Sequence, residues 1–118
     1  MRTTILGFNQ TNAIELGLNT DDLLILDYII RANGNPTMYH ISEDNISYVW
    51  LSHTKIHEDL PILNMAESTL KNRLVTLKKL GLIESKQFQD IGKRGSKTYY
   101  TVTEKTIEMT TSRQKYVR

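Results

Sequence analysis

The sequence predicts a single α+β domain in which a helical core carries a C-terminal β-hairpin, with a shorter additional hairpin nearer the N-terminus. Two observations predict this class. A capped and almost wholly apolar run predicts a helix at 20–31, and apolar residues recur at helical spacing within 67–80. Residues 82–102 contain two β-prone runs separated by a polar, glycine-containing stretch. The length of 118 residues suits one domain with one modest core.

The N-terminal third of the chain is expected to hold a short strand, a brief helix and a central helix. The strand is expected at 3–8 and the brief helix at 11–16. Thr20 can cap the third element, which continues through an almost wholly apolar stretch. Such a helix must be buried, with Asp27 and Arg31 spaced four apart as its one polar strip.

The middle of the chain is expected to form a hairpin and a short helix. The β-prone runs 38–42 and 46–51 are separated by Glu-Asp-Asn, which is typical of a hairpin turn. Ser52 can then cap a helix that Pro61 terminates, because proline cannot continue a helix from its interior.

The clearest helix of the sequence is expected at 67–80. Leu70, Leu74 and Leu77 recur at spacings of four and three, so one narrow stripe faces the core. Gly81 follows directly and is suited to the left-handed conformation that often ends helices.

A β-hairpin is expected directly after this helix, with strands at 82–88 and 97–102 joined by the polar turn 89–96. The last residues, 104–118, are polar, threonine-rich and weakly periodic. We expect them to be a linker or a helix that forms only with a partner, so that the domain spans 1–103.

Charge is distributed unevenly along the chain. Residues 1–66 contain three basic and eight acidic side chains, a net charge of −5. Residues 67–97 contain eight basic and three acidic side chains, a net charge of +5. A basic segment of this kind indicates one surface that faces a polyanion.

Several function classes are excluded or disfavoured by the sequence. The absence of cysteine excludes disulfides, thiolate metal sites and cysteine nucleophiles. No apolar run approaches the roughly 18 residues of a membrane span. His53 and His57 have a spacing that can ligate a metal, but a third ligand in register is missing. We therefore expect no enzyme, no cofactor and no metal.

The outward face of 67–80 carries side chains that can read base pairs. An α-helix fits the major groove, and base contacts come mostly from the N-terminal half of such a helix. Asn72 is suited to adenine and Arg73 to guanine. The expected base-reading residues are Ser68, Thr69, Lys71, Asn72 and Arg73.

The tip of the second hairpin is expected to contact the DNA backbone or the minor groove. Gly92 and Gly95 allow the tip to bend and approach a backbone, and cationic side chains lie between and beside them. The expected backbone or minor-groove residues are Thr76, Lys78, Lys79, Lys93, Arg94, Ser96 and Lys97. The alternative is an ordinary surface helix and a solvated turn, and the adjacency of the two elements favours DNA.

Aromatic residues in the strands admit a second interpretation. Tyr48, Trp50, Tyr99 and Tyr100 could form a base-stacking platform for single strands. Their alternation within short strands favours packing in the core and the hairpins instead.

Parts of the sequence resemble known families. Leu-Pro-Ile-Leu at 60–63, Ser-Thr-Leu at 68–70, Leu-Gly-Leu-Ile at 80–83 and Gly-Ser-Lys-Thr-Tyr-Tyr at 95–100 resemble the winged helix-turn-helix of bacterial regulators and initiators. Tyr-Val-Trp-Leu-Ser at 48–52 and Lys-Ile-His-Glu-Asp-Leu-Pro at 55–61 resemble the N-terminal domains of replication-initiator and replisome-organiser proteins of phages and mobile elements.

The resemblance implies a winged helix-turn-helix that binds double-stranded DNA during replication initiation of a phage, plasmid or mobile element. It implies a bacterial cytoplasmic location with the DNA, replication proteins as partners and no membrane. A small transcriptional regulator or repressor, and an interaction module without DNA binding, remain alternatives because fold alone does not fix function. A homodimer also remains open, since many winged-helix regulators read paired half-sites.

Overall fold

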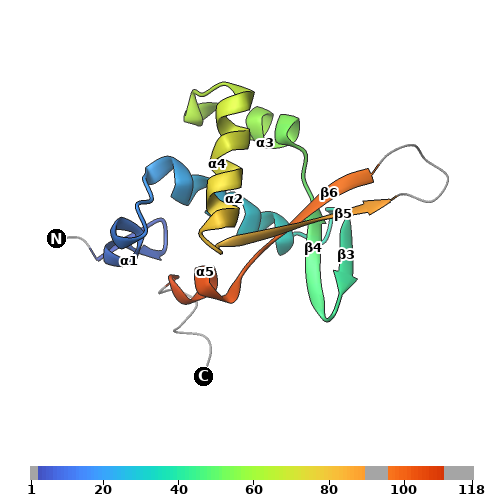
Figure 1. The fold of residues 1–118 in the computed structure, drawn as a ribbon, viewed down its shortest axis with the longest axis horizontal. Helices are drawn as coiled ribbons and strands as arrows, with labels where there is room; N and C mark the ends of the chain where they lie inside the picture. Colours follow the sequence, from blue (N-terminus) through green and yellow to red (C-terminus); the bar gives the residue numbers. More distant parts are fainter. Residues whose placement is uncertain (1–2, 90–95, 111–118) are drawn as a thin grey trace.

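The computed structural model describes residues 3–89 and 96–110, which form a helical part and a four-stranded sheet (Figure 1). The helices are α1 (Gln10–Glu15), α2 (Thr20–Asn33), α3 (His53–Asp59), α4 (Glu67–Lys79) and α5 (Glu104–Glu108), with a 3₁₀ turn at Pro61–Leu63. The strands are β1 (Thr4–Ile5), β2 (Phe8–Asn9), β3 (His40–Glu43), β4 (Ile46–Trp50), β5 (Ile83–Gln89) and β6 (Ser96–Val102). Within the described ranges, no helix is both long and apolar enough to cross a membrane.

The element order confirms the predicted α+β class and the winged helix-turn-helix. Helices α3 and α4 with the turn between them form the helix-turn-helix, and β5 with β6 forms the wing, which extends away from the helices (Figure 1). The sequence predicts two separate hairpins, β3–β4 and β5–β6. In the structure they form one antiparallel sheet of order β3-β4-β6-β5, because β4 pairs with β6 through Val49 with Tyr100 and Trp50 with Tyr99.

The core lies between α2 and one face of this sheet. Ile25, Leu26 and Ile29 of α2 are fully buried, as the apolar run predicts. They belong to the same apolar cluster as Val49 and Tyr100 from the sheet. Helix α2 is therefore the central buried helix. Asp27 and Arg31, the predicted polar strip, form an ion pair at its surface (2.9 Å).

Helix α2 begins with a capping box one residue earlier than the sequence predicts. The N-cap is Asn19 rather than Thr20. The Asn19 side chain accepts the N–H of Asp22 (3.0 Å), and the Asp22 carboxylate accepts the N–H of Asn19 (3.0 Å). The reciprocal pair satisfies two N–H groups, which Thr20 alone could not do.

The N-terminal run 3–8 is a tight hairpin rather than the single expected strand. Leu6 and Gly7 both have positive φ angles (55° and 84°), and they reverse the chain between β1 and β2. The β3–β4 turn has the same character, with Asp44 at 54° and Asn45 at 64°. Two successive residues with positive φ match the twist of a hairpin, although a leucine there is uncommon and obscures the signal in the sequence.

The folded unit extends past the predicted boundary at 103. Thr106 is fully buried, and its hydroxyl donates to the carbonyl oxygen of Leu82 (2.6 Å). Met109 is 3% exposed and its carbonyl oxygen accepts the N–H of Asn9 (2.7 Å). The segment containing α5 thus packs on the domain through a single buried turn, which is too short to produce a periodic stripe in the sequence.

Candidate nucleic-acid interface

The start of α4 is held against α3 by two contacts across the turn. His57 Nε2 lies 2.8 Å from the carbonyl oxygen of Met65. The hydroxyl of Thr54 donates to Glu67 Oε1 (2.9 Å) in the first turn of α4. At the N-terminus of α3, the Ser52 hydroxyl accepts the N–H of Lys55 (3.0 Å), so Ser52 is the N-cap that the sequence predicts. These bonds fix where the N-terminal half of α4 lies.

The inward face of α4 consists of the predicted leucine stripe. Leu70, Leu74 and Leu77 are 0%, 3% and 0% exposed, and all three belong to the core cluster. Gly81 follows with φ of 77°, the left-handed conformation that the sequence predicts. The helix therefore has a rigid inner side and a defined outer side.

The outer face of α4 gathers four of the predicted base-reading residues. Ser68, Thr69, Lys71 and Asn72 are all exposed in the first half of the helix. The side chains of Ser68, Thr69 and Asn72 make no hydrogen bond within the part of the chain that the structure describes. Their donors and acceptors are available to a ligand, and their role in reading bases stays a prediction.

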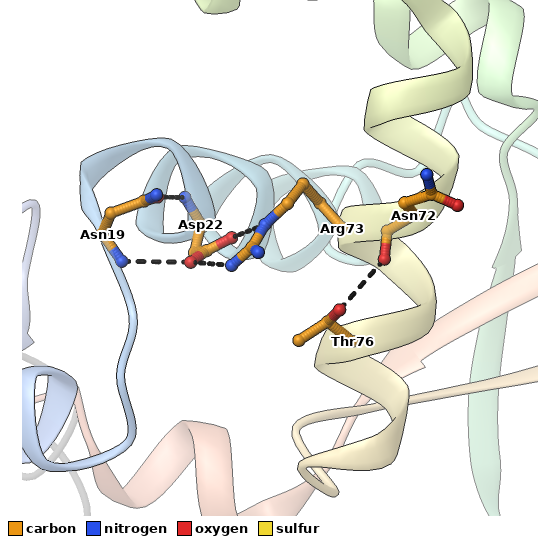
Figure 2. A network of polar contacts seen from close by, with 5 residues as sticks. All are labelled: Asn19, Asp22, Asn72, Arg73 and Thr76. Atoms are coloured by element: carbon orange, nitrogen blue, oxygen red, sulfur yellow. Dashed lines mark hydrogen bonds and ion pairs between the residues drawn. The ribbon is translucent and has the colours of Figure 1, made fainter.

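Arg73, the fifth predicted base-reading residue, is directed inward to α2 (Figure 2). Its Nε donates to Asp22 Oδ1 (2.8 Å), and its Nη2 donates to Asp22 Oδ2. The Asp22 side chain is completely buried, whereas that of Arg73 is 30% exposed. The hydrogen bond to Asp22 raises the pKa of Arg73. The guanidinium neutralises a buried carboxylate, so the expectation that Arg73 reads guanine is wrong.

The residues expected to contact the backbone from α4 have different surroundings. The hydroxyl of Thr76 donates to the carbonyl oxygen of Asn72 (3.1 Å), which engages its proton within the helix (Figure 2). Lys78 Nζ donates to the hydroxyl of Ser85 on β5 (2.9 Å). Lys79 is exposed at the end of α4. The two lysines therefore lie at the helix end nearest β5, where a phosphate contact remains a prediction.

The strands of the wing form a regular antiparallel pair. β5 and β6 pair from Ile83 with Val102 to Gln89 with Ser96. Lys97 Nζ lies 4.3 Å from the centroid of the Trp50 ring. The predicted contacts of Lys93, Arg94 and the Ser96 side chain lie outside the described residues.

The two histidines considered as metal ligands have separate partners. His53 Nε2 lies 3.3 Å from the hydroxyl of Tyr100, whereas His57 contacts the backbone across the turn. Burial lowers the pKa of His53, and the charge of Lys71 lowers it further. Among the described residues, no group of three or more histidine, aspartate or glutamate side chains could hold a metal ion.

Neither the family models nor the curated proteins gave a match. Among solved structures, the chain is similar to the crystal structure of the ferric uptake regulator (Fur) of Vibrio cholerae, which reveals a structural rearrangement of the DNA-binding domains of that protein. The match has 18% sequence identity and a TM-score of 0.47, and it covers 79% of this chain and 60% of that chain. The winged-helix assignment rests on the strand order and the helix-turn-helix described above.

Proposed function

We propose that this chain binds double-stranded DNA with a sequence preference, placing α4 in a major groove and the β5–β6 wing against the neighbouring backbone or minor groove. The observation that carries the proposal is the exposed polar face of α4. It presents Ser68, Thr69, Lys71 and Asn72 together, on a helix whose opposite side is anchored in the core. A base-reading helix needs these two properties at once.

Each side chain of this face has a chemical task in the proposal. The Asn72 side chain can donate through its amide nitrogen to N7 of adenine and accept through its oxygen from the N6 amino group. This pair of bonds matches the edge of adenine in the major groove. The ammonium of Lys71 can donate to guanine or to a phosphate, and the hydroxyls of Ser68 and Thr69 suit either bases or phosphates. Arg73 is not part of this set, because its guanidinium is committed to Asp22.

Charge supports the same orientation. Exposed lysines 71, 78 and 79 lie on α4, and the wing sequence adds further cations. Because cations that contact phosphates release counterions, affinity should fall steeply with salt. Fluorescence anisotropy with random and genomic duplexes at two salt concentrations tests this. Absence of salt-sensitive binding at low ionic strength would contradict the proposal and leave a protein-interaction module.

Within DNA binding, we propose a role in replication initiation of a phage, plasmid or mobile element, with replication proteins as partners. The support is the resemblance of residues 48–61 to initiator proteins. A transcriptional regulator would use the same surface of α4. Selection of sites from a randomised duplex library, followed by their mapping, separates the two roles. Repeats clustered at an origin support initiation, whereas isolated promoter operators contradict it.

A change of Asn72 to alanine should weaken binding to the preferred site by about 1 to 3 kcal/mol and relax the preference at one base position. The loss comes from the bidentate contact, so non-specific affinity should change little. Anisotropy titrations with the selected site and with single-base variants measure both effects. Asn12→Ala on α1 is the matched control, because Asn12 is also an exposed helical asparagine. If affinity and preference both survive Asn72→Ala, Asn72 does not read bases.

Changes of Lys93 or Arg94 to alanine should act differently. As phosphate contacts of the wing, they should weaken binding to all sequences and each lower the slope of log affinity against log salt by about one. Titrations at several salt concentrations measure the slope. A loss confined to one target sequence would show that the residue reads bases instead.

A further inference from the structure

The outer face of the sheet, opposite the helical core, carries a cluster of aromatic side chains. Successive residues of a strand point to opposite faces, and paired residues share a face. Val49 and Tyr100 are paired and belong to the core cluster. The next pair, Trp50 and Tyr99, therefore lies on the outer face, together with Tyr48 two residues earlier on β4.

Part of this outer face is closed by its own rings. Phe88 packs edge-on against Tyr48 (centroids 6.0 Å apart) and against Tyr99 (5.3 Å). Tyr48 and Tyr99 are consequently 1% and 6% exposed. For these residues and Tyr100, the packing interpretation of the sequence is correct. Tyr48, Phe88 and Tyr99 form a packed aromatic cluster, and the two tyrosine rings offer almost no surface to a ligand.

Trp50 and Tyr39 are more exposed than the two tyrosines of this packed cluster. Tyr39 is 72% exposed, and it is the one exposed aromatic side chain among the described residues. Its ring lies 6.1 Å from that of Trp50, which is itself only partly buried. The N–H of Trp50 donates to the carbonyl oxygen of Tyr39 (3.0 Å), so the backbone beneath both rings is fixed. The sequence does not indicate a role for Tyr39, because its neighbour Trp50 lies on another strand.

Lysine ammonium groups lie over two of the rings on the outer face, those of Trp50 and Tyr48. Lys97 Nζ is 4.3 Å from the centroid of Trp50, a cation–π distance. Lys86 Nζ is 5.4 Å from the centroid of Tyr48, where it also forms an ion pair with Glu43. Trp50 connects these features, because its ring lies 6.1 Å from the exposed Tyr39 ring and 4.3 Å from the Lys97 ammonium. A nucleotide offers a flat base to an exposed ring and a phosphate to a cation. A peptide would match both features only if it carried an acidic side chain at the right spacing, whereas every nucleotide carries a base and a phosphate.

We propose that Tyr39, Trp50 and Lys97 form a site for single-stranded DNA, with an unpaired base stacked on the Tyr39 ring and its phosphate near the Lys97 ammonium. The site is distinct from the base-reading face of α4 and does not depend on it. Lys97 is shared with the residues expected to contact a duplex from the wing, so the two modes of binding are separated at Tyr39 and Asn72.

The test uses the full chain and fluorescence anisotropy with a labelled oligothymidine strand. An abasic deoxyribose-phosphate strand of the same length separates stacking from attraction to phosphates. Tyr39→Ala should weaken oligothymidine binding about tenfold or more, since stacking on one ring accounts for that loss. Tyr39→Phe should bind as the unchanged chain does, because it retains the ring. Ile14→Ala on α1 is the matched control, since Ile14 is 62% exposed and α1 lies at the other end of the long axis from β3 (Figure 1).

The result that supports the site is a loss specific to Tyr39→Ala, together with at least tenfold weaker binding of the abasic strand. Equal binding of the Tyr39→Ala variant, or of the abasic strand, would overturn it. A dimer in sedimentation that Tyr39→Ala dissociates, without oligothymidine binding, would also overturn it and assign the surface to a second copy. Circular dichroism checks that the variants fold. Asn72→Ala should leave oligothymidine binding unchanged, so failure of the duplex proposal is distinguishable from failure of this one.

Discussion

Replacing Arg73 by alanine should lower the free energy of unfolding by about 3 to 5 kcal/mol. The substitution would leave the completely buried Asp22 carboxylate without the guanidinium that neutralises it. The N–H of Asn19 would remain as a partner, but a single neutral donor does not compensate a buried charge. Urea unfolding followed by circular dichroism measures the change.

Arg31→Ala is the matched control for this prediction. Arg31 also pairs with an aspartate, Asp27, but its own side chain is 79% exposed. Exposed pairs spaced four apart on a helix contribute only about 0.3 to 0.5 kcal/mol, so this variant should unfold almost as the unchanged chain does. If Arg73→Ala were as stable as Arg31→Ala yet failed to bind DNA, Arg73 would have to be restored as a DNA contact.

A second large effect is expected at Leu74 in the middle of α4. Leu74→Ala should cost about 2 to 5 kcal/mol, because it removes a buried side chain and leaves a cavity between α4 and the core. The size within this range depends on how far the surrounding side chains relax. The same urea unfolding experiment measures it, with the midpoint expected at a lower concentration and an unchanged slope.

Val75→Ala is the control at the adjacent position. Val75 is 46% exposed, whereas Leu74 is 3% exposed. A surface substitution of this kind usually changes stability by less than about 0.5 kcal/mol. Similar losses at both positions would mean that the inner and outer faces of α4 are assigned incorrectly, and the proposed DNA surface would be assigned incorrectly with them.

The sequence predicts well what local patterns determine. The leucine spacing in α4 identifies its buried stripe, and the apolar run in α2 identifies the central helix. Ser52 and Gly81 mark the start of α3 and the end of α4, since caps depend on one residue and its immediate neighbours. The four exposed residues of the proposed reading face follow from the same periodicity.

Long-range contacts could not be predicted in this way. Arg73 and Asp22 are 51 positions apart, and nothing local shows that an arginine on the margin of α4 would turn toward the first turn of α2. The pairing of β4 with β6 is equally non-local, so the two hairpins were expected to be separate. Tyr39 was missed for the same reason, because its neighbour Trp50 lies on another strand.

The pairing of β4 with β6 fixes the spacing that a DNA target would need in the proposed mode of binding. β4 ends at Trp50 and α3 begins at His53, so the strand that supports the wing leads directly into the helix that supports α4. The two proposed contact surfaces are therefore joined through one continuous backbone connection and one sheet. In the proposed complex, the fold then fixes the separation between the bases at α4 and the DNA backbone at the wing. Insertion of base pairs between these two parts of a target should then abolish one set of the proposed contacts, because α4 and the described strands of the wing belong to one folded unit.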